Sequence, residues 1–106
     1  MKRLPKAFQM GPNTIRVVIL SKEDLDAEAA KTGQPSVVGL CDYDADIIYL
    51  RKAGRGFPKR KQMHTFWHEY FHMLLYHVGR ERLARDEVLV DNMGALHLQV
   101  MQTAEF

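Results

Sequence analysis

The sequence of 106 residues contains one cysteine, Cys41, which excludes an internal disulfide. A lone cysteine also matches none of the zinc sites built from cysteine pairs, and it favours a reducing compartment such as the cytoplasm. No segment approaches the roughly 18 consecutive apolar residues of a membrane-spanning helix, and the basic N-terminal stretch lacks the apolar core of a signal peptide. We therefore expect a cytoplasmic protein that does not enter a membrane.

An excess of charge of one sign is also lacking. Lys and Arg contribute 15 side chains and Asp and Glu contribute 13, which leaves a formal net charge of +2 at pH 7. Because the two signs of charge are nearly balanced, the sequence gives no indication of a strongly basic surface that would bind nucleic acid. We therefore expect no nucleic-acid partner. The basic run Lys59–Lys61 is interpreted as the solvated start of a helix, with contact to a phosphate group as the alternative.

The length permits a single domain over residues 1–106, in which residues 1–13 are expected to be irregular. β-Branched and apolar runs predict strands, and capping or stop signals delimit the helices. The expected elements are a strand over Thr14–Leu20, a helix over Lys22–Lys31, a hairpin of Val37–Cys41 with Ile47–Leu50, a helix over Pro58–Val78 and a last helix from Leu83 or Ala84 to Gln102. This order predicts an α+β fold in which a small three-stranded sheet has its helices gathered on one side.

Four of the five histidines fall within the stretch "HTFWHEYFHMLLYH", from His64 to His77. At about 100° per residue, His72 lies about 40° from His68, and bulky apolar side chains occupy the neighbouring face. Two histidines one helical turn apart can bind one zinc ion through their ring nitrogens. Glu69 has the position of the general base in the H-E-x-x-H pattern, where a carboxylate takes a proton from the attacking water. The alternative is a chance string in an amphipathic core helix.

A hydrolytic site of this kind needs a third protein ligand from a later element. Glu87 lies 15 residues beyond His72, past a turn at Gly79, and we expect it to complete the metal site. Asp91, one helical turn further, is expected to accept the free N–H of a ligand histidine and so fix its orientation. Two carboxylates at this spacing repel each other unless a cation lies between them. Gly94 is expected to let the last helix approach the histidine helix closely.

With these residues in place, the chain resembles the gluzincin metallopeptidases. "HEYFH" matches their H-E-x-x-H signature, and "EVLVD" matches the E-x-x-x-D of their glutamate helix. In size and element order the chain is most similar to the minigluzincins and the ImmA/IrrE-type peptidases, with "VVGLCDYDADIIYL" resembling their hairpin. Two departures are the bulky Tyr70 and Phe71, where small residues are usual, and the lack of room for the second subdomain that stabilises the oxyanion in larger gluzincins.

The resemblance implies a minimal zincin-like fold, one Zn²⁺ per chain, and hydrolysis of peptide bonds in a peptide or protein substrate. It implies that the zinc ligands are His68, His72 and Glu87. Glu69 is then the general base and acid, and Asp91 is the partner of a ligand histidine.

The same resemblance implies that the first hairpin strand, at Val38, Gly39 and Leu40, forms a rim of the cleft. A substrate in extended form could add a strand to this edge through backbone hydrogen bonds. A paired or solvated edge is the alternative, and the two interpretations stay open.

The remaining histidines and tyrosines are interpreted mainly as structural. His64 lies on the ligand strip, so contact with a substrate is an alternative to a surface position. His77 points away from the metal and is expected near the helix dipole, while His97 could contact either the cleft or the core. Candidate donors to the oxyanion are Tyr43, Tyr49 and Tyr76.

Two functions of other classes remain compatible with the sequence. One is a latent or non-catalytic zinc-binding regulatory domain, whose metal would be fully coordinated by protein. The other is an accessory module that binds protein or nucleic acid, for which the basic segment Arg55–Lys61 is the sole support.

Overall fold

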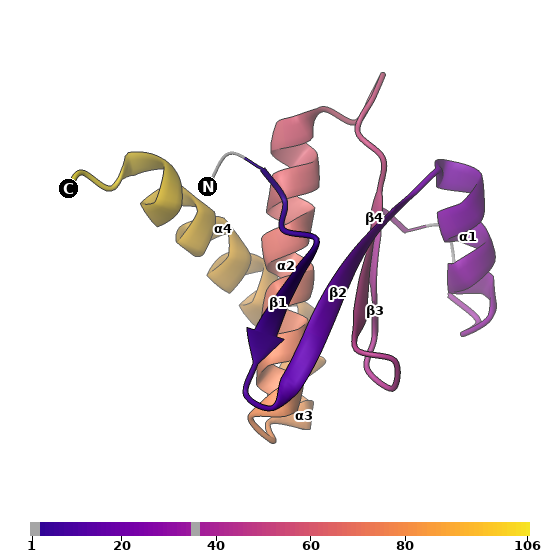
Figure 1. Ribbon diagram of the computed structural model, residues 1–106, viewed down its shortest axis with the longest axis horizontal. Helices are drawn as coiled ribbons and strands as arrows, with labels where there is room; N and C mark the ends of the chain where they lie inside the picture. Colours follow the sequence, from indigo (N-terminus) through magenta and orange to yellow (C-terminus); the bar gives the residue numbers. More distant parts are fainter. Residues whose placement is uncertain (1–2, 35–36) are drawn as a thin grey trace.

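The computed structural model describes residues 3–34 and 37–106. Its central feature is a four-stranded mixed sheet with the order β1-β2-β4-β3 (Figure 1). The strands are β1 (Ala7–Met10), β2 (Asn13–Leu20), β3 (Gly39–Asp42) and β4 (Ile47–Arg51). β2 and β4 are parallel, whereas β1 pairs antiparallel with β2 and β3 pairs antiparallel with β4. The α+β class is as expected, and β3 forms one edge of the sheet.

The strand β1 lies in a segment for which no regular structure was expected, so the sheet has four strands where three were predicted. A two-residue loop joins β1 to β2, and Gly11 at its first position has a φ of 61°. Glycine is favoured there because a type II′ hairpin turn needs positive φ at this position. Phe8 and Met10 pack against the hydrophobic core and fix the strand to the domain.

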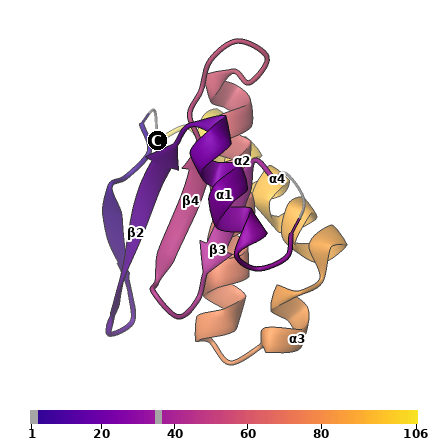
Figure 2. The same ribbon diagram turned by 90° about the vertical axis from the view of Figure 1, so that its right-hand side faces the viewer.

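Helix α1 (Lys22–Ala30) follows β2 and begins as expected, with the Ser21 hydroxyl accepting a hydrogen bond from the Asp24 N–H at 3.1 Å. Figure 2 shows α1 in front of the sheet and the long helices behind it. The expectation that all helices gather on one side is therefore wrong. The physical reason is that β2 and β4 are parallel, so the chain must cross over the sheet between them, and α1 is part of that crossover. It buries Leu25 and Ala29 completely.

Helix α2 (Lys59–His77) covers the other face of the sheet and carries the H-E-x-x-H segment. Its apolar side chains Phe66 and Met73 are fully buried against Ile48 and Leu50 of β4. Burial of each such side chain stabilises the fold by about 1.5–3 kcal/mol. This packing presents the polar strip of α2 beside the edge strand β3. No helix in residues 3–34 and 37–106, α2 included, is long and apolar enough to cross a membrane.

The chain after α2 forms two helices, α3 (Glu81–Ala84) and α4 (Glu87–Thr103), instead of the single helix expected from residue 83 or 84. The break has a local cause: the Asp86 carboxylate caps α4 by accepting a hydrogen bond from the Leu89 N–H at 3.0 Å. The cap places Glu87 in the first turn of α4, on the side that faces α2.

Helices α2 and α4 approach each other closely at Gly94. A Cβ atom at this position would lie 3.0 Å from the backbone nitrogen of His68 and 3.2 Å from its Cα. The role expected of this glycine is therefore confirmed, because two helix backbones leave no room for a side chain here.

Candidate metal centre

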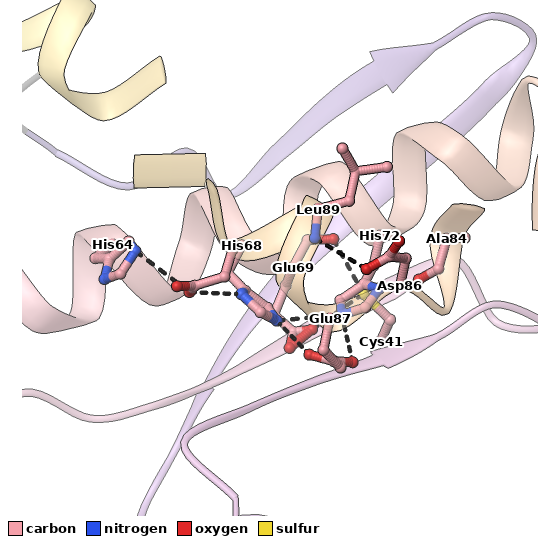
Figure 3. A network of polar contacts seen from close by, with 10 residues as sticks. Cys41, His64, His68, Glu69, His72, Ala84, Asp86, Glu87 and Leu89 are labelled. Carbon is pink, nitrogen blue, oxygen red and sulfur yellow. Dashed lines mark hydrogen bonds and ion pairs between the residues drawn. The ribbon is translucent and has the colours of Figure 1, made fainter. Parts of the chain in front are cut away.

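His68, His72 and Glu87 converge on one point between α2 and α4 (Figure 3). The Nε2 atoms of the two histidines are 3.1 Å apart. One carboxylate oxygen of Glu87 lies 3.0 Å from His68 Nε2, and the other lies 3.0 Å from His72 Nε2. Three donors held tetrahedrally at about 2.0–2.1 Å from one zinc ion are roughly 3.3 Å apart, and the two Nε2 atoms have nearly this separation, with one Glu87 oxygen close to each. The structure thus brings together the three residues that were expected to be ligands.

Each of the two imidazoles is held through its other ring nitrogen. His68 Nδ1 lies 3.1 Å from Asp91 Oδ1, and His72 Nδ1 is hydrogen-bonded to the backbone carbonyl of Ala84. Both partners are acceptors, so each Nδ1 carries the proton and donates it. Asp91 has the position that was expected of it, whereas the contact to Ala84 depends on the short helix α3, which was not predicted.

This pattern of hydrogen bonds leaves lone pairs facing one another in the centre of the site. In the neutral form of the two imidazoles both Nε2 atoms are acceptors, and they meet the Glu87 carboxylate at 3.0 Å. Acceptors this close repel one another, and a cation between them replaces the repulsion by attraction. Two imidazole nitrogens and a carboxylate oxygen form a donor set that zinc accepts. The residues present therefore fit a bound divalent metal ion.

Glu69 lies beside the three ligands and is nearly buried, with 7% of its surface exposed. The pKa of its carboxyl group is raised to about 7. Loss of hydration is the largest cause, His72 and then Cys41 lower the pKa, and the Glu87 carboxylate raises it by a smaller amount. A carboxyl group with a pKa near neutrality can both accept a proton and return it. This is the property that a general base and acid requires.

Cys41 contacts Glu69 at the site, and the sequence analysis did not identify it as a site residue. Its Sγ atom lies 3.1 Å from the Glu69 backbone oxygen and 3.4 Å from Glu69 Oε2, so the thiol can donate toward both. Burial and then the Glu69 carboxylate raise the pKa of the Cys41 thiol, which keeps its proton. The two residues are 28 positions apart, so no local motif reveals the contact. The available signal was strand alternation, which places Gly39 and Cys41 on the same face of β3.

Gly39 lets β3 lie close against α2. A Cβ atom on Gly39 would be 2.6 Å from Thr65 Cγ2 and 3.0 Å from Glu69 Cγ. Of its two neighbours in the expected rim, Val38 precedes β3 and is 42% exposed, whereas Leu40 is buried. Gly39 is thus the residue of the expected rim that lies against Glu69.

A cleft of about 640 Å³ runs along the edge of β3 and past the metal ligands. One wall carries the polar side chains of α2 and α4, and the other is formed by the chain before and within β3. The residues that line it are Gln34, Val37, Val38, Gly39, Arg51, His64, Thr65, His68, Glu69, Glu87 and Asp91. The cleft therefore contains two of the expected ligands, His68 and Glu87, together with Glu69 and most of the expected rim, whereas His72 lines a smaller hollow that also contains Glu69 and Glu87.

His64 belongs to this site, since its Nε2 atom lies 3.6 Å from Asp91 Oδ1. His77 does not: it contacts Asp46 Oδ1 at 2.8 Å and Asn13 Nδ2 at 3.1 Å, and so joins α2 to the turn before β4 and to the start of β2.

His97 lies in the aromatic part of the core, where its ring centroid is 4.2 Å from that of Trp67. Tyr43 stacks on Tyr76 at 4.5 Å and lines a smaller hollow that also contains His72. Tyr49 is on β4, opposite Leu40. Of the three candidate tyrosines, Tyr43 is the one that shares a hollow with metal ligands.

Comparison of the chain with models of protein families, with curated proteins and with solved structures finds no match. The chemistry open to the site is therefore inferred from its geometry. That geometry combines three metal donors, a nearly buried carboxyl group of near-neutral pKa, and the free edge of a strand.

Proposed function

We propose that the protein is a zinc-dependent metalloendopeptidase of the gluzincin type, with a minimal zincin-like arrangement of its elements. The observation that carries the proposal is the cluster of three possible metal donors, His68, His72 and Glu87, beside the nearly buried Glu69 and next to a cleft. Structural zinc sites are closed by four protein ligands, whereas hydrolytic sites have three and keep a position for water. The cluster in residues 3–34 and 37–106 has three members, and 70% of the Glu87 side chain is exposed, which leaves the site open to solvent.

The ligand set would hold zinc through His68, His72 and Glu87. When bound, the ion lowers the pKa of a water molecule toward neutrality and polarises the carbonyl of the scissile peptide bond. Asp91 and the Ala84 carbonyl fix the tautomers of the two imidazoles, so that both Nε2 atoms stay directed into the site.

Glu69 moves the proton during hydrolysis. It accepts a proton from the attacking water and then delivers it to the leaving amine, which its near-neutral pKa allows. The Cys41 thiol, 3.4 Å from Oε2, and the close contact with Gly39 restrict the orientation of the carboxylate. A positioned base of this kind contributes roughly 10²–10⁴-fold to the rate.

The edge of β3 offers backbone groups to an extended peptide. The Arg51 N–H donates to the Val38 carbonyl at 3.0 Å, so Val38 uses its hydrogen-bonding groups toward β4. Because antiparallel pairing alternates, the backbone N–H and C=O of Gly39 and Cys41 point toward the free edge. A substrate strand that pairs with Gly39 would pass beside Glu69.

The first test is the zinc content of the purified protein, measured by elemental analysis without added metal. We expect about one zinc per chain in the wild type and little in Glu87→Ala, because two ligands of this type hold zinc weakly. The matched control is Glu81→Ala, which removes an exposed carboxylate of α3 and should leave the zinc content unchanged. Absence of metal from the wild type would overturn the proposal.

The second test separates an enzyme from a regulatory zinc domain. Glu69→Gln should retain zinc and lose at least about 100-fold in the hydrolysis of unfolded casein, because the amide cannot accept a proton. Equal hydrolysis by this variant and the wild type, or no hydrolysis by zinc-loaded wild type, would favour the non-catalytic alternative.

A further inference from the structure

Arg51 is a cation that lines the cleft and that the proposed mechanism does not use. It is the last residue of β4, its side chain is half-buried, and it lines the same cleft as Glu69. Its guanidinium group lies over the Phe57 ring, 5.2 Å from the centroid, which restricts the side chain without neutralising its charge. In residues 3–34 and 37–106, no carboxylate forms an ion pair with Arg51.

The three acidic side chains that share the cleft are engaged by other groups, and Glu69, the most buried of them, lies beside the Cys41 thiol. Asp91 accepts from His68, and Glu87 lies between the two ligand histidines. The positive charge of Arg51 is therefore available to a ligand that enters the cleft. The side chain next to it, Val38, is apolar and 42% exposed, so it offers no competing polar group.

The register of the sheet specifies which part of a bound peptide would meet Arg51. Gly39 is opposite Leu50, and the hydrogen bond from the Arg51 N–H to the Val38 carbonyl extends this register by one residue. Residues directly opposite each other have their side chains on the same face of the sheet. In a peptide paired with β3, the residue opposite Val38 would therefore have its side chain on the same face of the sheet as Arg51. The next peptide residue, opposite Gly39, would point toward Glu69, because a Cβ atom added to Gly39 points that way.

We propose that Arg51 selects peptide substrates with an acidic side chain at the residue adjacent to the one that faces Glu69. The inference rests on the proposed function and names the substrate class of the same site. Arg51 acts on specificity by an ion pair with the substrate carboxylate, and it takes no part in moving the proton. The N–H groups of its guanidinium can donate two parallel hydrogen bonds to a carboxylate, whereas its positive charge would repel a basic side chain at this substrate position.

Cleavage specificity gives the first test. A mixture of peptides from a digested proteome is incubated with zinc-loaded protein, and the new ends are identified by mass spectrometry. We expect Asp and Glu to be enriched about fivefold at one position within two residues of the cleaved bond. An enrichment of this size corresponds to the binding free energy of one partly exposed ion pair. Arg51→Gln should abolish the enrichment, and Arg51→Glu should replace it by Lys and Arg. Lys52→Gln is the matched control, since Lys52 is an exposed neighbour with the same charge and does not line the cleft.

Binding gives a second test that does not depend on activity. Two pools of fluorescent hexapeptides, degenerate except for one fixed Glu or Gln, are titrated against the Glu69→Gln protein and followed by anisotropy. We expect about fivefold tighter binding of the Glu pool at low salt, lost when Arg51→Gln is added to the variant and retained with Lys52→Gln.

The outcomes distinguish the two proposals. Equal binding of both pools, together with cleavage sites that show no acidic preference, would overturn the role of Arg51 and leave the peptidase assignment intact. Preference for the Glu pool that depends on Arg51, with no cleavage by the zinc-loaded protein, would support the role of Arg51 and overturn the peptidase assignment.

Discussion

Gly94 of α4 lies directly against the backbone of His68 in α2. A Cβ atom at residue 94 would be 3.0 Å from the His68 nitrogen and 3.2 Å from its Cα. Both contacts are to helix backbone, so the two helices can accommodate a side chain only by moving apart as units. The spacing of α2 and α4 sets the distance from Glu87 to the two histidines. This spacing is possible because residue 94 is a glycine and has no side chain.

Gly94→Ala should therefore weaken both the fold and the metal site. Alanine favours the helix by about 1 kcal/mol over glycine, but forcing a methyl group into packed backbone costs about 1–3 kcal/mol. We expect a net loss of about 1 kcal/mol in the free energy of unfolding, measured by urea denaturation, and weaker zinc binding in competition with a chelator. Gly54→Ala is the control, because a Cβ there meets nothing within 4 Å. Zinc affinity that stays at the wild-type value would contradict the link between this contact and the site.

Asp91→Asn should lower the affinity for zinc by about tenfold, the lower end of the range for carboxylates that hold a ligand histidine. Asp91 Oδ1 accepts from His68 Nδ1 at 3.1 Å, and the neutral amide holds the imidazole less firmly. The measurement is a competition titration with a colorimetric chelator. Asp44→Asn makes the same change of charge at an exposed turn residue and should bind zinc as the wild type does. Equal affinities in the two variants would show that Asp91 does not support the ligand.

Gly39→Ala should impair hydrolysis more than metal binding. The added Cβ would lie 2.6 Å from Thr65 Cγ2 and 3.0 Å from Glu69 Cγ, so it displaces the general base while His68 and His72 stay in place. We expect kcat/KM to fall by at least about tenfold with zinc content unchanged, since a displaced base loses part of its 10²–10⁴-fold contribution.

A second substitution checks the steric cause of that loss. Thr65→Ser removes Cγ2 and keeps the hydroxyl that donates to the Lys61 carbonyl at 2.8 Å. Combined with Gly39→Ala, it should restore part of the lost activity. No recovery in the double variant would indicate that the contact with Glu69, and not that with Thr65, dominates.

The buried Cys41 thiol should make the protein less stable at alkaline pH. Burial raises the pKa of this thiol in the folded state, with the Glu69 carboxylate as the next cause. Above the unfolded-state pKa of about 8.5, the unfolded chain loses a proton that the folded protein keeps, so the free energy of unfolding falls as pH rises. The slope from one such group is at most about 1.4 kcal/mol per pH unit.

Urea denaturation of the wild type and Cys41→Ala between pH 7 and 10 measures this contribution. We expect the decline above about pH 8.5 to be shallower in the variant. Alkylation by iodoacetamide at pH 8 should also be slow in the folded wild type, because the thiolate is the reactive form. Parallel pH dependences of the two proteins would exclude the thiol as the cause.

The residues of the candidate metal cluster could be predicted from the sequence because the spacing of each pair along its helix is local. Helical periodicity alone puts His68 and His72 on one strip of α2, and the same rule places Glu87 and Asp91 on one strip of α4. The close approach at Gly94 followed from the cost of a glycine inside a helix.

Features that depend on contacts between distant segments could not be predicted in the same way. β1 is four residues long and is stabilised by pairing with β2 and by core contacts, although Gly11 was a turn signal that the sequence analysis did not use. The face covered by α1 depends on the parallel pairing of β2 with β4, which no local pattern encodes. The contact of Cys41 with Glu69 arises only when the sheet docks on α2.

The short helix α3 and its cap also affect how the chain can assemble. All three ligands, together with the groups that orient the imidazoles, lie between His68 and Asp91 in one continuous helical hairpin, whereas the sheet joins strands separated by α1 and its flanking loops. Closing a loop of this length costs little entropy, and contacts between near neighbours in sequence form early in folding. A metal ion bound at the proposed site would therefore hold α2 and α4 together before β2 pairs with β4, so the site proposed for catalysis would also stabilise an early step of folding.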